Sequence, residues 1–511
     1  MDLTKPILYH AHRTPHQEAL IYDNRRYTYQ ELNEEINRYS HGLMEQGIQK
    51  GDKVSLFLKN SDAFVIASYA IWKTGAVMVP INFRLTASEL TYILRQSDSV
   101  AVIVDEELAD VAKNAIAQIN RPLTLYVVGE QYDGGVDWAS VRTNNIEEPD
   151  VMISPIDDAQ ILYTSGTTGQ PKGALFTHAN IISLNMSVHV MTKLSPEDVY
   201  LLIAPAFHSA GLNMILTSSF FAGSTLVVQR DFHPVEAQKA IQQYGVTMFF
   251  AVPAMYNAIL QVPKGSFDLS SIRACNYGAA PMSPGLIQAA VDYFGTDQFY
   301  NCCGLTEGGP GGVVLTPEEH KTKLGAAGKA MPFLNARVVN EQMEDVAPGE
   351  VGEFIIRSSS VMKEYYKKPE ETGQTLRNGW LLTGDLATID EDGYITLVDR
   401  KKDMIISGGE NIYSVEVEQI LNSHSQILEA AIIGLPDPQW GEVVTAIIVP
   451  KPGENIKEDE VQAFCRQSLA GYKVPRHFIT TDVLPRNASG KILKYHLREQ
   501  WRDARSLNET N

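Results

Sequence analysis

The sequence predicts an α/β protein with a large N-terminal domain and a smaller α+β C-terminal domain. The chain has 511 residues, several times the ~100 to 150 residues of one domain. Short runs of apolar and β-branched residues lie at 53–58, 100–105, 225–229 and 246–253. Helical stretches separate these runs, and such alternation is typical of parallel strands joined by crossover helices.

One crossover helix is predicted over residues 236–244. Its apolar residues Ala237, Ala240, Ile241 and Tyr244 follow the spacing i, i+3, i+4, i+7, so they form one stripe that faces a core. Gly245 provides a stop signal at the C-terminal end of this helix.

From about residue 333 to residue 400 the pattern changes, because shorter runs are broken by turn signals at 348–349, 378–379 and 392–393. We expect a meander or a small β-barrel that completes an N-terminal domain of residues 1–399. The basic run at 400–403 marks a boundary in this pattern. A smaller, separate α+β domain is expected at 404–511, where one helix face carries Val461, Phe464, Cys465 and Leu469.

The composition excludes several classes of protein. Hydrophobic residues make up 44% of the chain and charged residues 20%, as in globular proteins. The formal net charge of −18 argues against a broad surface for nucleic acid or anionic lipid. We expect no membrane span, since no apolar run approaches the ~20 residues that cross a bilayer. Four sparse cysteines and the lack of an export signal indicate the cytoplasm.

The strongest local signal is ILYTSGTTGQPKG at 161–173, where an apolar strand leads into a loop of glycines and hydroxyl residues followed by a lysine. Glycines free backbone N–H groups to face an anion, so this composition suits a polyphosphate. The loop is not a Walker A loop, because Gly173 follows the lysine where Ser or Thr is required. The residues expected at the phosphates are Thr164, Ser165, Gly166, Thr167, Thr168, Gly169 and Lys172.

This segment resembles the phosphate loop of the adenylate-forming superfamily, which holds acyl-CoA synthetases, luciferases and the adenylation domains of peptide synthetases. Further segments resemble its motifs in the right order: NYGAAP at 276–281, NCCGLTE at 301–307, the stretch 380–413 and LPRNASGKILKYHLRE at 484–499. The resemblance covers essentially the whole chain. It implies that residues 404–511 form a mobile lid domain, which rotates about a hinge at 400–403 with its pivot at Lys402.

The resemblance also implies residue roles around ATP. Glu307 corresponds to the magnesium ligand and Thr306 to a contact of the α-phosphate. Asp385 and Arg400 correspond to contacts of the ribose. Lys491 corresponds to the lysine that reaches the substrate carboxylate and the α-phosphate, where a charged ammonium acts electrostatically.

At the base and at the acid, the resemblance implies a second set of residues. Relatives usually carry an aromatic residue at the position of Cys303, so Tyr277 or Tyr300 is a candidate for stacking on adenine. His208 in PAFHSAGL matches a histidine at the mouth of the acyl pocket. The other residues expected at the nucleotide are Gly278, Ala279, Ala280 and Asn301.

Coenzyme A is the expected acyl acceptor. SGGENIY at 407–413 resembles the segment that lines the pantetheine tunnel of CoA ligases, and Gly408 and Gly409 allow close approach of a thin chain. Trp440, with Arg84 and Lys473, is a candidate outer contact for the CoA nucleotide. We expect no fused carrier domain, because only twenty residues follow the adenylation lysine.

These features predict an ATP- and Mg²⁺-dependent acid–thiol ligase that adenylates a medium- or long-chain fatty acid, transfers the acyl group to CoA, and releases AMP and pyrophosphate. The expected pocket segments 205–220, 249–259 and 276–282 contain no charged residue apart from His208. The glycines at 308–312 are explained equally well by room for a long tail and by loop flexibility. An aryl-acid or o-succinylbenzoate CoA ligase fits the same residues. A non-catalytic adenylate-binding relative and a luciferase-type oxygenase are further alternatives.

Overall fold

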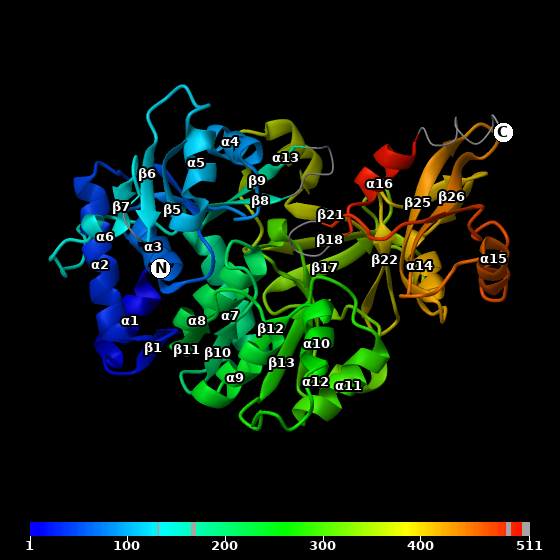
Figure 1. Cartoon of the computed structure of the whole chain (residues 1–511), viewed down its shortest axis with the longest axis horizontal. Helices are drawn as coiled ribbons and strands as arrows, with labels where there is room; N and C mark the ends of the chain where they lie inside the picture. The colour runs from blue at the N-terminus through cyan, green and yellow to red at the C-terminus, as the bar shows by residue number, and fades with distance from the viewer. Residues whose placement is uncertain (130–131, 165–169, 487–491, 503–511) are drawn as a thin grey trace. The chain divides into compact units, whose positions relative to one another are not determined.

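The computed structural model describes residues 1–129, 132–164, 170–486 and 492–502 (Figure 1). The chain divides into two compact units. The first comprises Met1–Ala336 and Ile356–Leu382, and the second comprises Arg337–Ile355 and Thr383–Asn511. The predicted hinge at 400–403 lies inside the second unit, and its role as a pivot stays a prediction.

The first unit contains an eight-stranded sheet in the order β19-β9-β8-β4-β3-β5-β6-β7. Its central strands pair in parallel, which confirms the crossover pattern predicted around residues 53–105. Helices α4 (Ala87–Gln96) and α5 (Ala109–Ile116) share a hydrophobic core with this sheet. The strands are β3 (Lys53–Phe57), β4 (Val77–Pro80), β5 (Ser99–Asp105), β6 (Thr124–Val128), β7 (Val136–Asp137), β8 (Asp158–Thr164), β9 (Lys172–Thr177) and β19 (Glu364–Tyr365).

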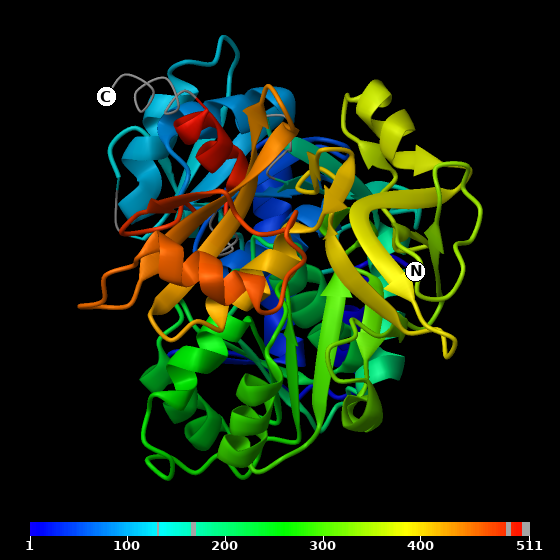
Figure 2. The same ribbon diagram turned by 90° about the vertical axis from the view of Figure 1, so that its right-hand side faces the viewer.

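A nine-stranded sheet in the order β16-β15-β14-β13-β12-β10-β11-β1-β2 also belongs to the first unit. The helix predicted at 236–244 is confirmed as α9 (Pro234–Tyr244), which ends at Gly245 with a φ of 63°. It packs on the sheet with α10 (Pro253–Leu260) and α11 (Pro284–Phe294) (Figure 2). The strands are β1 (Glu18–Tyr22), β2 (Arg25–Thr28), β10 (Val199–Leu202), β11 (Thr225–Val228), β12 (Met248–Ala251), β13 (Ala274–Gly278), β14 (Phe299–Gly304), β15 (Gly312–Leu315) and β16 (Lys329–Ala330).

The remaining helices of the first unit cover and connect these sheets. They are α1 (Lys5–Arg13), α2 (Tyr29–Glu45), α3 (Asp62–Lys73), α6 (Trp138–Val141), α7 (His178–Thr192), α8 (Thr217–Ala222), α12 (Pro317–Lys323) and α13 (Pro369–Thr375). A π-helical segment, Ala210–Leu216, precedes α8. Within the described part of the chain, no helix has the length and apolar character to cross a membrane.

A five-stranded sheet occupies the region in which a meander or small barrel is predicted, with β22 beside β21 and the order β17-β18-β21-β20. Asn378 and Gly379 have φ values of 51° and 77° and join β20 to β21, as the turn signal predicts for a two-residue hairpin. The strands are β17 (Leu334–Val339), β18 (Gly352–Ser358), β20 (Leu376–Arg377), β21 (Trp380–Ile389) and β22 (Ile395–Arg400).

The second unit carries a further five-stranded sheet, in the order β24-β23-β26-β25 with β27 beside β26. Val461 and Cys465 of α15 are fully buried in its core, which confirms the helix face predicted there. The elements are β23 (Ile405–Ser407), β24 (Glu410–Ile412), α14 (Ser414–Asn422), β25 (Ile427–Asp437), β26 (Gly441–Pro450), α15 (Glu458–Arg466), β27 (His477–Thr480) and α16 (Lys494–Trp501). The α/β class with an α+β C-terminal part is therefore confirmed.

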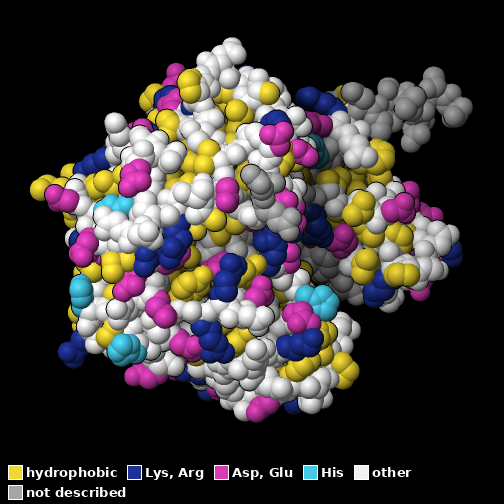
Figure 3. All heavy atoms as spheres, turned by 60° about the vertical axis from the view of Figure 1, so that its left-hand side comes forward, with side chains coloured by type: hydrophobic (Ala, Val, Ile, Leu, Met, Phe, Trp, Pro, Cys, Tyr) yellow, Lys and Arg dark blue, Asp and Glu magenta, His cyan; other side chains and the backbone are white. Residues whose placement is uncertain are grey.

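Charged side chains of both signs are interspersed over the face drawn in Figure 3. This distribution agrees with the expectation from the net charge that any anionic ligand is held by a local group of residues.

Candidate active site

Strands β8 and β9 form the stem of the predicted phosphate loop. They pair antiparallel, and Thr164 lies opposite Lys172 at the open end of the hairpin. The hydroxyl oxygen of Thr164 lies 3.5 Å from the carbonyl oxygen of Lys172. The predicted phosphate contacts Ser165, Gly166, Thr167, Thr168 and Gly169 lie outside the described residues.

Glu307 meets the stem of this loop. It sits in a short 3-10 turn, Thr306–Gly308, directly after β14. Its Oε1 accepts a hydrogen bond from the Thr164 hydroxyl at 3.5 Å and another from the Tyr365 phenol at 2.7 Å. The structure therefore brings together two residues that the sequence analysis assigned to phosphate and magnesium.

Tyr365 is the site residue that the sequence analysis missed. It lies on β19, opposite Ala174 of β9, and is 4% exposed. The ammonium of Lys172 lies 4.4 Å from the centre of its ring, a cation–π distance. Burial, and next the adjacent Glu307 carboxylate, raise the pKa of Tyr365, so that its phenol keeps a proton to donate at neutral pH.

The segment around His208 reaches the same group of residues. Ser209 lies 3.4 Å from Thr306, hydroxyl to hydroxyl. The preceding loop is held by the buried Asn60, whose side chain accepts from the N–H of Ala206 and donates to the carbonyl of Ala204. Burial lowers the pKa of His208 below 6.5, so its imidazole is neutral at pH 7.

The residues expected at adenine lie where two parallel strands end. Gly278 of β13 pairs with Cys302 of β14, and a Cβ atom at Gly278 would lie 2.2 Å from the Cys302 carbonyl oxygen. Ala279, with a φ of 66°, and Ala280 follow directly after β13. Asn301 of β14 donates from its amide to the carbonyl of Ala326 over 3.4 Å.

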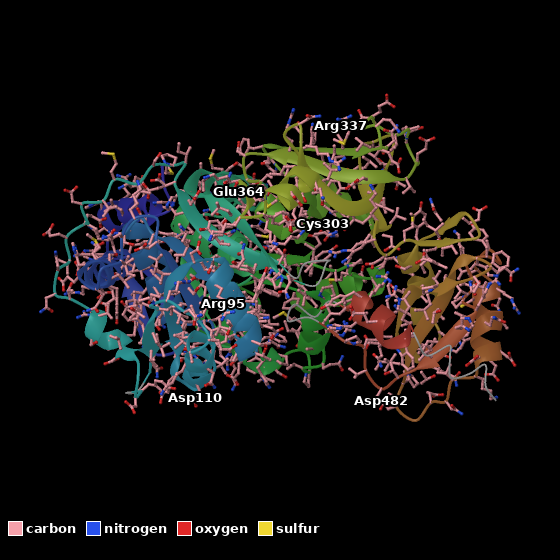
Figure 4. The ribbon with its side chains drawn as sticks, turned by 90° about the horizontal axis from the view of Figure 1, so that it is seen from above. Arg95, Asp110, Cys303, Arg337, Glu364 and Asp482 are labelled. Carbon is pink, nitrogen blue, oxygen red and sulfur yellow. The ribbon has the colours of Figure 1, made fainter. Side chains whose placement is uncertain are left out.

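The tyrosines that were candidates for stacking on adenine are unsuited to it. Tyr277 and Tyr300 are only 2% and 7% exposed, so neither offers an open ring face. The Tyr277 hydroxyl is also within 3.0 Å of Nε2 of His320. Cys303, labelled in Figure 4, lies on β14 and is partly exposed.

The glycines at 308–312 are explained by close backbone packing rather than by room for a tail. A Cβ atom at Gly309 would lie 2.6 Å from the carbonyl oxygen of Ser360, and one at Gly312 would lie 2.1 Å from that of Cys303. The loop is also held by two buried side chains. The Ser360 hydroxyl donates to the carbonyl of Gly308 at 2.9 Å, and the Asn213 amide donates to that of Gly309 at 3.0 Å.

In the second unit, Asp385 and Arg400 face one another across β21 and β22. Nε of Arg400 lies 3.5 Å from Oδ1 of Asp385, so the predicted ribose contacts form an ion pair. The backbone N–H of Asp385 donates to the Thr383 hydroxyl at 3.1 Å. Burial lowers the pKa of the neighbouring Lys402, the expected pivot.

The expected CoA segment forms a two-residue turn between β23 and β24. Gly408 and Gly409 have φ values of 61° and 86°, which L side chains rarely adopt. Trp440 covers Gly408, where a Cβ atom would lie 2.9 Å from the indole ring. Arg476, which the sequence analysis did not identify, places its guanidinium 4.2 Å from the centre of that indole.

Lys473 and Arg84, the candidate outer contacts for the CoA nucleotide, already contact other side chains. Lys473 forms an ion pair with Glu416 at 2.8 Å, which already occupies its ammonium. Arg84 belongs to the first unit, and its guanidinium lies 5.2 Å from the centre of the Phe83 ring.

Lys491 lies outside the described residues, but helix α16 follows it closely and is anchored by charge. Nζ of Lys494 lies 2.7 Å from Glu418 and donates to the Ser414 hydroxyl at 2.6 Å. One turn later, Arg498 pairs with Asp403 at 2.9 Å. These contacts fix the helix that carries the C-terminal end of the predicted lysine loop.

The described donors fit a magnesium ion held jointly by protein and phosphate. Glu307 and Thr164 offer hard oxygen atoms, which Mg²⁺ prefers. Among the described residues there is no group of three or more His, Cys, Asp or Glu side chains that could enclose a metal ion. This is the pattern of a cation bound through one carboxylate together with substrate phosphates.

Comparisons with known proteins agree with this arrangement. A feruloyl-CoA synthase of Amycolatopsis sp. is 39% identical over 492 residues, covering 96% of this chain and 97% of that protein. A long-chain-fatty-acid–CoA ligase of Mycobacterium tuberculosis is 38% identical over 93% of each chain. The solved o-succinylbenzoate coenzyme A synthetase of Bacillus subtilis, in complex with ATP and magnesium ion, superposes with a TM-score of 0.86 at 30% identity, covering 97% of this chain and 98% of that chain.

Two family models account for most of the chain. Residues 8–366 match the AMP-binding enzyme model, and residues 416–491 match the AMP-binding enzyme C-terminal domain. The two relatives named above, which match along nearly the whole chain, are a CoA synthase and a CoA ligase. The chain belongs to the AMP-binding enzyme family.

Proposed function

We propose that this protein is an acid–CoA ligase that uses ATP and Mg²⁺ to join an apolar carboxylic acid to coenzyme A. The observation that carries the proposal is the contact of Glu307 with Thr164, next to Lys172, at the open end of the β8–β9 hairpin. This cluster offers one carboxylate for a cation, and hydroxyl and ammonium groups for phosphate oxygens. A non-catalytic adenylate-binding relative has no need for that combination.

The proposed chemistry has two steps. In the first, a carboxylate oxygen of the acid attacks the α-phosphorus of ATP, a P–O bond forms, and pyrophosphate leaves. In the second, the CoA thiolate attacks the acyl carbon, a C–S bond forms, and AMP leaves. The magnesium ion, held through Glu307, supplies charge neutralisation at the phosphates.

The residues of this chain act mainly by position and charge. Lys172, Thr306 and Lys491 neutralise the charge that builds up at the α-phosphate as pyrophosphate departs. Asp385 and Arg400 orient the ribose and thereby fix the reacting phosphorus. His208, neutral at pH 7, is available as a hydrogen-bonding group rather than as a charge at the mouth of the acyl pocket.

The two steps assign different tasks to one part of the chain. Lys491 serves the first step, whereas the Gly408-Gly409 turn serves the second, and both belong to the second unit. We therefore propose that residues 404–511 rotate about Lys402 between the steps. Lys491→Ala should abolish adenylation but spare thioester formation from supplied acyl-adenylate, whereas Lys402→Pro should do the reverse because it restricts φ at the pivot.

For the acid, we propose a medium- or long-chain fatty acid. The support is the apolar composition of segments 205–220 and 249–259, which contain no charged residue apart from His208. The similarity to a long-chain-fatty-acid–CoA ligase agrees with this choice. A hydroxycinnamate-type acid is the second candidate, favoured by 39% identity to a feruloyl-CoA synthase and by the closed packing of the glycines at 308–312.

A panel of acids separates these candidates. Pyrophosphate release should be measured with ATP, Mg²⁺ and CoA for saturated acids of increasing length and for ferulate, coumarate, benzoate and o-succinylbenzoate. Each buried methylene adds up to ~0.8 kcal/mol, so kcat/KM should rise with chain length until the pocket ends. A higher kcat/KM for the aryl acids than for octanoate and longer acids would replace the fatty-acid proposal with the second candidate.

Free CoA is the proposed acceptor, and the cytoplasm is the proposed compartment. All four cysteines are free thiols in the structure, which suits a reducing environment. Replacement of CoA by a separately supplied carrier protein in the same assay tests the acceptor.

A further inference from the structure

Tyr365 contacts both charged residues of the proposed phosphate site. Its hydroxyl donates to Oε1 of Glu307 at 2.7 Å, and its ring face lies 4.4 Å from the ammonium of Lys172. Although both charges lie against this one side chain, the ion pairs of the described residues do not include one between Lys172 and Glu307. The tyrosine therefore holds a cation and an anion apart while contacting each.

The backbone around Tyr365 fixes it in this position. Strand β19 adds to β9 next to the phosphate loop, with Glu364 opposite Leu175 and Tyr365 opposite Ala174. Figure 4 labels Glu364 on this strand. The N–H of Tyr365 donates to the Thr372 hydroxyl at 2.9 Å, which ties it to α13.

The same segment also holds the backbone of Glu307. The N–H of Met362, three residues before Tyr365, donates to the Glu307 carbonyl at 2.8 Å. Residues 362–365 therefore hold Glu307 by two hydrogen bonds, one to its backbone carbonyl and one to its carboxylate. A hydrogen bond from a fixed donor orients a carboxylate, and both the Tyr365 and Thr164 bonds use Oε1, so neither occupies Oε2.

We propose that Tyr365 is a positioning residue for the phosphate and metal site: it turns the Glu307 carboxylate toward the cation and keeps Lys172 from pairing with it. This inference rests on the proposed function only for the identity of the ligands. Removal of the hydroxyl frees the carboxylate to turn, and removal of the ring lets Lys172 reach Glu307, so that each charge neutralises the other before the nucleotide binds.

The test is Tyr365→Phe, which retains the ring and loses the donor, beside Tyr365→Met, which loses both. Tyr366→Phe is the matched control, because the neighbouring hydroxyl donates to Asp98 at 2.9 Å, away from Glu307. Mn²⁺ binding to the complex with a non-hydrolysable ATP analogue is measured by electron paramagnetic resonance. Thermal unfolding of each variant is recorded in parallel.

We expect Tyr365→Phe to bind Mn²⁺ about tenfold more weakly with little change in nucleotide affinity, since a hydrogen bond to a charged group is lost. Tyr365→Met should weaken both the metal and the nucleotide, and Tyr366→Phe should match the wild type. Excess Mg²⁺ should restore adenylation in Tyr365→Phe, because only the affinity for the cation is reduced.

Wild-type Mn²⁺ affinity in a folded Tyr365→Phe protein would overturn the proposal. If Tyr365→Phe unfolds, Tyr365→Met decides: unchanged nucleotide and metal affinity in that variant also overturns it. Because Mn²⁺ binding is measured without an acid, its outcome is separate from the proposed function, which fails instead if the wild-type protein releases no pyrophosphate with any acid.

Discussion

The phosphate site of the first unit and the anchor of α16 in the second unit use charged residues in opposite ways. Around Glu307, a hydroxyl and an aromatic ring stand between the anion and the nearest lysine. Around α16, Lys494 and Arg498 are paired directly with Glu418 and Asp403. The charges around α16 are paired with one another. Glu307 and Lys172, in contrast, form no ion pair among the described residues, so both are available to phosphate and metal.

Asp399 belongs to the same charge network as Lys494, because the Ser414 hydroxyl accepts from Lys494 and donates to Asp399. Asp399 is 6% exposed and accepts from both the backbone N–H and the hydroxyl of Ser414. Burial raises the pKa of Glu418, although Lys494 lies against it. Such a network is costly to break at one member, because the partner is left buried without its counter-charge.

The largest expected effect is on the activity of Glu307→Gln. The amide keeps the shape of the side chain but removes the charge, so kcat/KM for pyrophosphate release should fall by about 10²-fold. The free energy of unfolding should change little, because Glu307 forms no ion pair within the described part of the chain. Glu364→Gln on the adjacent β19 is the control, and an equal loss of activity in both variants would break the comparison.

Lys494→Met should lower the stability of the protein and leave phosphate binding unchanged, the opposite of Glu307→Gln. It leaves Glu418 partly buried without its cation, which should lower the free energy of unfolding by about 2–3 kcal/mol. Urea denaturation followed by tryptophan fluorescence measures this change. Lys457→Met is the control, because its pair with Glu460 is exposed and adds little to stability. Equal shifts in the two variants would contradict a structural role for the anchor.

His178 is a buried titratable group that forms no ion pair among the described residues. It is 0% exposed, its Nε2 has no hydrogen-bond partner in the described structure, and Nδ1 accepts from the N–H of Leu3 at 3.3 Å. Burial lowers its pKa from 6.5 to about 4. Between these two values the unfolded chain binds the proton and the folded chain does not, so stability falls as the pH decreases.

For the wild type, this single group should remove about 2 kcal/mol of stability between pH 7 and pH 5. His178→Gln should lack this loss of stability between pH 7 and pH 5. His12→Gln, which alters an exposed histidine, should retain it. Urea denaturation at several pH values measures it. A pH dependence that is identical in wild type and His178→Gln would show that the folded protein tolerates the charge.

The fold and part of the site could be predicted from sequence because they depend on local patterns. The period of apolar residues predicts α9 and α15, and Asn378-Gly379 predicts a hairpin. Motif resemblance identified Thr164 and Glu307, which the structure places in contact. By contrast, Tyr365 becomes a site residue only when β19 pairs with β9, and no local pattern in EYYKKP distinguishes it from a core tyrosine.

Two interpretations failed for the same physical reason. The glycines at 308–312 indicated space, but a Cβ atom at Gly309 would meet the backbone of Ser360 and one at Gly312 would meet the backbone of β14. Tyr277 and Tyr300 were candidates for stacking on adenine, but they are buried in the first unit. Both features depend on segments that are distant in sequence, which a single sequence does not reveal.

We propose that the charges of Glu307 and Lys172, in the first unit, serve adenylation. The most direct measurement is the nucleotide product formed from ATP and Mg²⁺ with a saturating fatty acid and CoA, quantified by chromatography beside the acyl-CoA formed. We expect one AMP and one pyrophosphate for each acyl-CoA, with product formation in Glu307→Gln reduced about 10²-fold over the same interval. ADP and phosphate as the main products, or AMP formation that survives unchanged in Glu307→Gln, would contradict it.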